Sequence, residues 1–510
     1  MRQSATPKER LRKSIQEIAC LRAQVVFVAS VVMLLLTLTF LHEFTRMFDY
    51  SLNENIDDWF GWAKVAWRYF QPGIGVNPVT GLHYGAKGWH RFTDWDLAAY
   101  VSAIINAERL ELISKDGPWG SNYRLEKILN FLETRPITGD QLPYAQYDAD
   151  TSGVPIDIGN RTAHPSDSAR LLLVLDDLRN SRPDLASRIE SIITRYDFEL
   201  FCQSDYFSAN DIYPFYAAQG YWAFGFSTPK LRGLEALGNG NTVDVCGEKL
   251  PKAQVTSEPL VLAILENRTC ELYKMYADSV FFAQQKRYEQ TGKLTAFSEG
   301  MYQAPYYYVF EWVVTDEGKI WTIRAGEDVN GPEVVYTKMA FAFHAIYGNY
   351  YTRTLVERAL SLVSMDGFLE GIMEDGKTVA TVSDKTNGMI LQAARYSISM
   401  SAVADLTSGS VFPRYAITTF VVSHELIDLQ LQLLGAVGAH DFTLIYKENE
   451  LNQVRSIYNA FRNYSDCIIP ELSFMQTLEP SDRERVVEAT FETFKSVSGR
   501  YPPGIFSFQL

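Results

Sequence analysis

The chain has 510 residues, of which 47% are hydrophobic and 13% aromatic, so it can form a large core, and this composition excludes a mainly disordered protein. Its formal net charge of −14 argues against nucleic acid as a partner, because phosphate binding requires clustered Lys and Arg. An uncharged polymer is the better candidate partner.

An uncharged apolar run at residues 25–41 predicts a membrane-spanning helix, and Ala23 and Gln24 extend it to 23–41. Lys and Arg outnumber acidic residues in the basic tail at 1–22, so the positive-inside rule places this tail in the cytoplasm. No A-x-A-like cleavage site follows, which favours a retained signal anchor. We therefore expect a single-pass membrane protein with a linker at 42–56 and an extracytoplasmic main domain.

Four of the five cysteines follow the predicted span: Cys202, Cys246, Cys270 and Cys467. Four cysteines allow three pairings, and the sequence selects none of them.

Helical periodicity dominates residues 57–400, in segments separated by loops rich in Gly, Pro and Asp. In 96–113 the apolar residues follow one helix face, and Thr93 or Asp94 can cap the helix. The pattern predicts helices over 57–70, 96–113, 122–132, 167–180, 185–196, 260–267, 271–291, 336–347, 352–364 and 388–397. These helices come in pairs without the fixed period of a solenoid, which favours a closed ring of helical hairpins.

The pattern changes in the last hundred residues. Short β-like runs at 416–422 and 442–446 flank a helix-like segment at 426–434, and an amphipathic segment at 482–497 follows. This alternation predicts a small α/β module over 410–510.

A series of motifs between residues 59 and 396 carries a family resemblance. In chain order they are WRYFQP, TDWDLAAYVSAIINAERLELI, LPYAQYDADTSG, SDSARLLLVLDDL, IYPFYAAQGYWAFGF, VTSEPLVLAILE, YEQTGKLTAFSEG with PYYYVFEW, KMAFAFHAIYGNYYTRTL and TNGMILQAARY. Together they resemble the uncharacterised-domain family DUF3131, which is similar to glucoamylase-like proteins and to the cyclising transglycosylase domain of cyclic β-1,2-glucan synthases. The resemblance implies a mainly α (α/α)6 toroid and β-glucan or exopolysaccharide chemistry.

The C-terminal stretch resembles the opening part of a polysaccharide deacetylase domain. Such enzymes bind a metal through one Asp and two His, and the segment where the His pair would fall reads ELSFMQTL. The resemblance therefore implies a partial module without a metal site.

Three glutamates are candidates for acid–base chemistry at a glycosidic bond, which needs a proton donor and a second carboxylate. By resemblance, Glu258 takes the position of the acid in the Y-N-E-A motif of the glucoamylase-like relatives; its alternative role is a first-turn Glu favoured by the helix dipole. Glu299 is expected in a loop before the aromatic run, where nearby rings would raise its pKa, or as a turn carboxylate accepting backbone N–H bonds. Glu370 loosely matches the base position of the glucanase relatives, or is a solvated loop acid.

Asp96 and several aromatic residues are candidates for sugar binding, because rings stack on pyranose faces while carboxylates bind hydroxyls. The alternative for the rings is packing between inner and outer helices, and the alternative for Asp96 is a role in the first turn of its helix. The predicted substrate-binding set is Trp95, Asp96, Tyr147, Asp148, Tyr216, Tyr221, Trp222 and Tyr306. No spacing typical of a zinc or EF-hand site occurs, so we expect no metal and no cofactor.

Two functions follow from these observations. The first is a membrane-anchored, extracytoplasmic glycoside hydrolase or transglycosylase that acts on β-glucan or exopolysaccharide, with Glu258 and either Glu299 or Glu370 as acid and base. The second is a non-catalytic glycan-binding or scaffold protein of a polysaccharide synthesis or export system.

Overall fold

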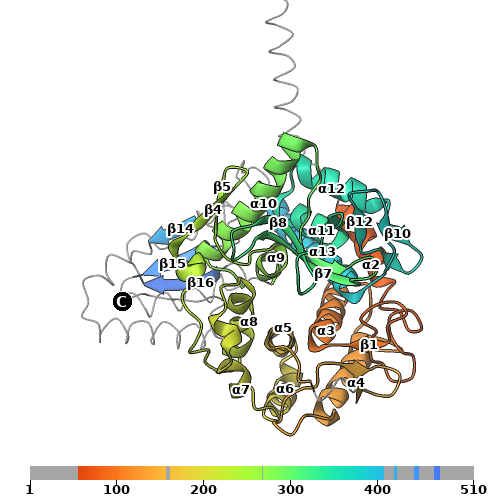
Figure 1. Cartoon of the computed structure of the whole chain (residues 1–510). Helices are drawn as coiled ribbons and strands as arrows, with labels where there is room; N and C mark the ends of the chain where they lie inside the picture. The colour runs from red at the N-terminus through yellow and green to blue at the C-terminus, as the bar shows by residue number, and fades with distance from the viewer. Residues whose placement is uncertain are drawn as a thin grey trace, which may run out of the picture. The chain divides into compact units, whose positions relative to one another are not determined.

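Helices alternate along the chain between an inner and an outer position (Figure 1). The computed structural model describes residues 56–156, 161–266 and 268–406, and three strands at 418–421, 442–446 and 465–470. Within these residues six inner helices form a closed ring, each packing on the next and the last on the first. They are α3 (Asp94–Arg109), α5 (Pro165–Ser181), α8 (Tyr213–Trp222), α9 (Ser257–Leu265), α11 (Thr337–Tyr347) and α13 (Asp384–Leu406).

The outer helices pack on this ring. Helix α2 (Ile56–Trp67) contacts α13, α4 (Ser121–Thr134) contacts α3, α6 (Ala186–Ile193) contacts α5, α10 (Glu271–Thr291) contacts α9, and α12 (Tyr350–Leu360) follows α11. Three short segments occur near α6 and α8 in the chain: η1 (Pro183–Leu185), α7 (Glu199–Cys202) and η2 (Asp205–Ser208). Between α8 and α9 the described chain forms η3 (Leu234–Gly240) and a hairpin of β4 (Thr242–Val245) and β5 (Glu248–Pro251), which packs on α10 in place of an outer helix.

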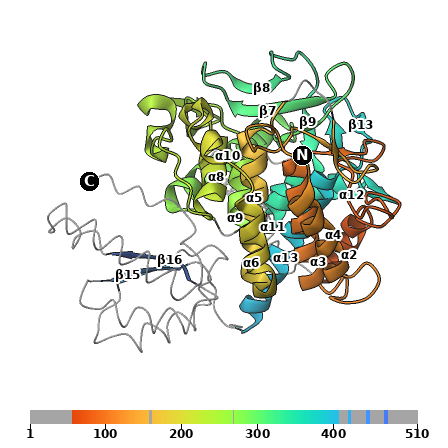
Figure 2. The ribbon, with the colours of Figure 1, turned by 90° about the horizontal axis from the view of Figure 1, so that it is seen from below.

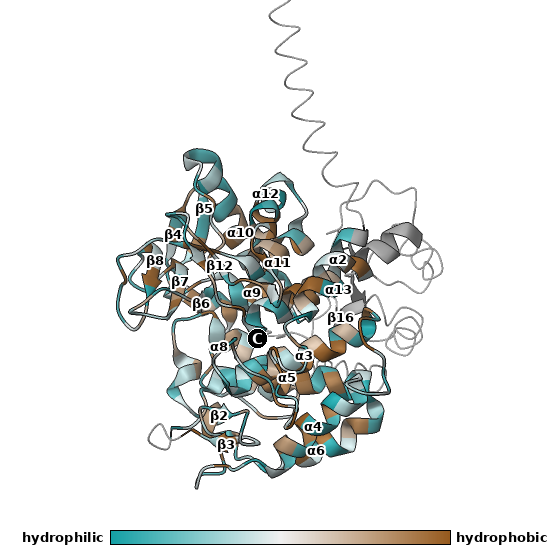
Figure 3. Ribbon diagram, turned by 90° about the vertical axis from the view of Figure 1, so that its right-hand side faces the viewer, coloured by the Kyte–Doolittle hydropathy of each residue, from teal (hydrophilic) through white to brown (hydrophobic). Residues whose placement is uncertain are grey.

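Burial explains why the inner helices are apolar on more than one face. In α3 every residue from Asp94 to Ala107 is buried, whereas α6 buries only Ile189, Ile192 and Ile193. Figure 3 colours much of α3 and α11 as hydrophobic and many exposed loops as hydrophilic. The core therefore lies within the ring and between the two helix layers.

Strands collect at one end of the helices (Figure 2). One antiparallel sheet has the order β6 (Glu299–Met301), β7 (Tyr308–Val314), β8 (Ile320–Arg324), and a second has the order β13 (Thr378–Val379), β12 (Gly371–Met373), β9 (Val334–Tyr336). Smaller sheets join β1 (Arg91–Phe92), β2 (Tyr147–Asp148) and β3 (Val154–Pro155), and β10 (Val363–Ser364) with β11 (Gly367–Phe368).

The prediction of a mainly helical chain is confirmed, and the predicted helix at 271–291 has the observed bounds of α10. Helix α8 and the sheet of β6, β7 and β8 were not predicted, and the stretch around Glu299 is a strand where a loop was expected. The predicted helix at 352–364 ends at Leu360, and β10 follows it.

Three parallel strands lie in the C-terminal region: β14 (Thr418–Val421), β15 (Phe442–Tyr446) and β16 (Ser465–Pro470). The first two coincide with predicted strands. The predicted helical segments at 426–434 and 482–497 and the span at 23–41 lie outside the described residues. Among the described residues no helix is long and apolar enough to cross a bilayer, and Cys202, Cys246 and Cys270 are free thiols.

Candidate functional site

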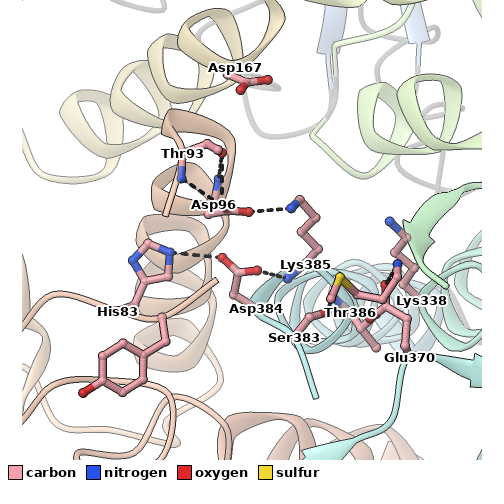
Figure 4. A network of polar contacts seen from close by, with 12 residues as sticks. His83, Thr93, Asp96, Asp167, Lys338, Glu370, Ser383, Asp384, Lys385 and Thr386 are labelled. Carbon is pink, nitrogen blue, oxygen red and sulfur yellow. Dashed lines mark hydrogen bonds and ion pairs between the residues drawn. The ribbon is translucent and has the colours of Figure 1, made fainter. Parts of the chain in front are cut away.

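The first turns of the inner helices carry charged and polar side chains, and Figure 4 shows those of Asp96, Asp167, Lys338 and Lys385 from α3, α5, α11 and α13. Positive partial charge at helix N-termini favours carboxylates at such a place. Ion pairs connect α3 with α13 and α9 with α11, and the charges of these groups act on Glu299 of β6. The contributing residues are Asp96 of α3, Asp167 of α5, Tyr213 of α8, Glu258 of α9, Lys338 of α11 and Lys385 of α13.

Glu258 is held as a buried carboxylate. Its side chain is 1% exposed, and its Oε2 accepts hydrogen bonds from Ser298 Oγ at 2.6 Å and from Lys338 Nζ at 2.5 Å. Lys338 is itself fully buried. Glu258 and Lys338 therefore form a buried ion pair, in which each group compensates the desolvation of the other.

The surroundings of Glu299, in contrast, disfavour a charged carboxyl group. Glu299 is 6% exposed, and burial followed by the nearby charge of Glu258 raises its pKa to about 8, although Lys338 and Lys385 act in the other direction. No residue in the described part of the chain donates a hydrogen bond to its carboxyl group. At neutral pH Glu299 is therefore a protonated acid.

Glu370 anchors strand β6. Its Oε2 accepts hydrogen bonds from Ser383 Oγ at 2.6 Å and Thr386 Oγ1 at 2.7 Å, and its Oε1 accepts one from the Met301 backbone N–H at 3.2 Å. Gly300 makes this approach feasible, since a Cβ atom there would lie 2.6 Å from the same Oε1 and 2.5 Å from Cε1 of Tyr336. Glu370 thus fixes the strand that carries Glu299.

Asp96 is fully buried, and its Oδ1 pairs with Lys385 Nζ at 2.5 Å. Its Oδ2 accepts hydrogen bonds from Thr93, which completes a capping box at the start of α3. Burial disfavours its charge, but the Lys385 ammonium outweighs burial and lowers the pKa of Asp96. The structure therefore supports a role in holding Lys385 rather than direct contact with a sugar.

Two further carboxyl groups, those of Asp384 and Asp167, lie on either side of the Asp96–Lys385 pair (Figure 4). Burial and the charge of Asp96 raise the pKa of Asp384 to about 6, and His83 Nε2 lies 3.0 Å from its Oδ2. Burial and the same charge raise the pKa of Asp167 to about 7, and within the described region its carboxyl group accepts only a long hydrogen bond of 3.4 Å from Ser166 Oγ. Acid groups thus outnumber cations at this end of the ring.

Most of the predicted stacking residues are core residues. Tyr147, Tyr216 and Tyr221 have no exposed surface, and their hydroxyls donate to the carbonyl oxygen of Pro136, to Glu266 Oε2 and to the carbonyl oxygen of Pro165. Trp95 is 5% exposed, and the Arg170 guanidinium lies 4.9 Å from its ring centroid. Their rings are covered by protein, which does not support the predicted contact with sugar.

The remaining predicted binding residues are more accessible. Tyr306 is 38% exposed, and Trp222 is half-buried with its Nε1 donating to Thr228 Oγ1 at 3.0 Å. Asp148 Oδ1 accepts hydrogen bonds from the Asp150 and Thr151 backbone N–H groups and so stabilises its own turn. No group of three or more potential metal ligands occurs among the described residues.

Sequence reasoning missed both lysines and Asp167. Each lies in the first turn of an inner helix, in the motifs KMAFAF, SDKTNG and SDSARL, and an inspection of every predicted helix start would have included them. It could not have paired them, because Lys338 lies 80 residues from Glu258 in the chain.

Comparisons with known proteins agree with this architecture. The chain matches the family model "Protein of unknown function (DUF3131)" over residues 61–399. It belongs to the DUF3131 family. No curated protein sequence matches this DUF3131 chain.

Solved structures share the fold at low sequence identity. An endo-β-1,2-glucanase from Chitinophaga pinensis, in complex with sophorotriose and glucose, is 13% identical with a TM-score of 0.51, over 68% of this chain and 96% of that one. A candidate glucoamylase from Bacteroides caccae is 12% identical with a TM-score of 0.50, over 67% and 94% of the two chains. One from Bacteroides fragilis is 12% identical with a TM-score of 0.50, over 69% and 95%. The DUF3131 protein therefore has a glucoamylase-like helical fold.

We predict that Gly300→Ala destabilises the protein by about 1–3 kcal/mol, because the new methyl group would collide with Tyr336 and Glu370. Thermal unfolding measures the effect. Gly61→Ala in α2 is the control, since nothing lies within 4 Å of its Cβ position and it should leave stability unchanged or raise it. Equal melting temperatures for Gly300→Ala and the wild type would contradict the close contact.

Lys338→Met should lower the free energy of unfolding by about 3–5 kcal/mol, because it leaves the Glu258 charge buried without a partner. Adding Glu258→Gln should recover part of the loss. The matched control is Lys286→Met, which removes an exposed lysine paired with Glu248 at 2.5 Å and should have little effect. A loss no larger than that of the control would show that the buried pair is not required.

Proposed function

We propose that this DUF3131 protein is a glycoside hydrolase or transglycosylase that acts on β-glucan or a related exopolysaccharide. The observation that carries the proposal is the pairing of two unlike carboxyl groups at one site. Burial raises the pKa of Glu299 to about 8, and no described residue donates a hydrogen bond to its carboxyl group, whereas Glu258 is ion-paired with Lys338. Two carboxyl groups whose environments drive their protonation apart are the arrangement that acid–base cleavage of a glycosidic bond needs.

In the proposed reaction Glu299 is the general acid. It transfers its proton to the glycosidic oxygen as the bond from that oxygen to the anomeric carbon breaks, so the leaving sugar departs as an alcohol. Glu258 acts on the anomeric carbon, either by removing a proton from an attacking water or by attacking directly. These roles differ from the predicted one for Glu258, since a carboxylate paired with a buried ammonium is a poor proton donor.

Glu370 and Lys385 are assigned supporting roles. Glu370 holds β6 through the Met301 backbone, and Lys385 limits how far the pKa of Glu299 rises. A glucan substrate is supported by the shared fold of the Chitinophaga pinensis glucanase, whose complex contains sophorotriose and glucose. We also propose that residues 23–41 anchor the chain and that its helical domain lies outside the cytoplasm.

Glu299→Gln should reduce kcat by about 10²–10⁴-fold, because the amide cannot transfer a proton. The measurement incubates the full-length protein with β-1,2-glucan and with a panel of other glucans, and it quantifies shortened or cyclised products. Glu327→Gln replaces an exposed glutamate and serves as the control. Wild-type activity should also fall as the pH rises through about 8, since Glu299 then loses its proton.

Binding without any product from the wild type would reject the catalytic proposal and favour the non-catalytic glycan-binding or scaffold function. Full activity in Glu299→Gln would instead reject the assignment of this residue as the acid.

The raised pKa of Glu299 also predicts a pH-dependent stability difference. The folded protein binds this proton up to about pH 8, whereas the unfolded chain releases it near the ordinary value of 4.5, so wild-type stability should fall between these pH values. Glu299→Gln removes the titration and should be more stable than the wild type at pH 8 by roughly 1–4 kcal/mol, with little difference at pH 4. Thermal unfolding at the two pH values tests this, and a constant difference would contradict it.

A further inference from the structure

Strand β7 has two unlike faces. The residues of one face are completely buried: Val309, Glu311 and Val313. The opposite face carries the β7 aromatic row, which consists of Tyr308, Phe310 and Trp312. Tyr308 and Phe310 are half-buried and Trp312 is 5% exposed, so part of the row remains accessible to a ligand.

The β7 aromatic row shares its face with the proposed acid. In the antiparallel pairing of β6 with β7, Glu299 lies opposite Phe310 and Met301 lies opposite Tyr308. Directly opposed residues of antiparallel strands project to the same side of a sheet. Phe310 is therefore the nearest cross-strand neighbour of Glu299 on that side.

The row also reaches two helix starts of the ring. The Tyr308 ring centroid lies 5.4 Å from Lys385 Nζ of α13, and the Trp312 ring makes an edge contact with Tyr213 of α8 at 6.1 Å. Successive ring centroids along the row are 5.7 Å and 6.0 Å apart, and the Phe310 and Trp312 rings are nearly parallel, at 12°. Trp312 therefore supports one side of Phe310.

The turn that joins β6 to β7 continues this aromatic surface. Tyr306 and Tyr307 are 38% and 64% exposed, and Tyr307 has a φ of +59°, a left-handed conformation that is costly for a residue with a Cβ. Strained backbone of this kind concentrates at functional sites. Here it accompanies an exposed ring beside the strand that carries Glu299.

We propose that the β7 aromatic row is the substrate-binding track of the site, and that it takes an uncharged oligosaccharide. One pyranose ring would stack on Phe310 beside Glu299, and the chain would continue over Tyr308 toward the turn. This inference rests on the proposed function and specifies its substrate class. Aromatic faces suit the C–H faces of pyranose rings.

The charges around the row select against an anionic glycan. Six carboxyl groups lie at this end of the ring, those of Asp96, Asp167, Glu258, Glu299, Glu370 and Asp384, and the two lysines are already paired with Glu258 and Asp96. A uronate would meet these carboxyl groups without an unpaired cation from either lysine. A neutral hexose unit needs no cationic partner.

Binding is measured by calorimetry with sophorotriose in the full-length Glu299→Gln variant, where no turnover is expected. Adding Phe310→Leu keeps an apolar side chain but removes the aromatic face, and it should weaken binding roughly tenfold. Adding Phe310→Trp should preserve affinity. Tyr123→Ala, which removes a 39% exposed tyrosine on α4, is the matched control and should leave affinity unchanged. Trigalacturonate, an acidic trisaccharide, should bind far more weakly than sophorotriose.

The outcomes separate this inference from the proposed function. Three results would each contradict the proposed substrate-binding track. They are unchanged affinity in Phe310→Leu, trigalacturonate binding as tight as that of sophorotriose, and no sophorotriose binding at all. If the wild type cleaves no glucan but binding still depends on Phe310, the track is supported and the catalytic proposal fails. If the wild type cleaves glucan and Phe310→Leu leaves KM unchanged, the track alone is rejected.

Discussion

The constraint on which the site depends is the convergence of six helix N-termini at one end of the ring. Helix dipoles attract acidic side chains to such a place, but burial makes each added negative charge costly. The structure resolves the conflict with two ion pairs, Lys338 with Glu258 and Lys385 with Asp96. Glu299 has no such partner among the described residues, and burial and the nearby Glu258 both disfavour its charge, so the least costly state of Glu299 is the protonated one.

The small sheets give this charge arrangement its geometry. Glu299 lies on β6, a strand of three residues. Its position is fixed by pairing with β7 and by the hydrogen bond that the Met301 backbone N–H donates to Glu370, which lies close to Gly300. Glu370 also accepts hydrogen bonds from Ser383 and Thr386 at the start of α13, the helix that carries Lys385. This contact fixes the position of Glu299 relative to Lys385. Strand and ring are therefore fixed relative to each other through one buried carboxyl group.

Periodicity predicted most helices because their apolar faces repeat locally, and the three glutamates predicted to be catalytic all lie near the same end of the ring. The sheet was missed because β7 is apolar on both faces apart from Glu311, which hides the alternation of a half-buried strand. Roles were harder to predict than positions. Glu258 has the sequence context of an acid, but its ion-pair partner, Lys338, lies 80 residues away in the chain.

The same reasoning explains why aromatic abundance was a poor guide to ligand contact. Tyr216 and Tyr221 lie in a motif as rich in aromatic residues as β7, but their hydroxyls, like that of Tyr147, are satisfied inside the core. What distinguishes Phe310 is its register opposite Glu299, together with a side chain that is only half-buried. A neutral sugar placed there brings no charge toward Glu299, so binding would leave intact the electrostatic balance that keeps the acid protonated.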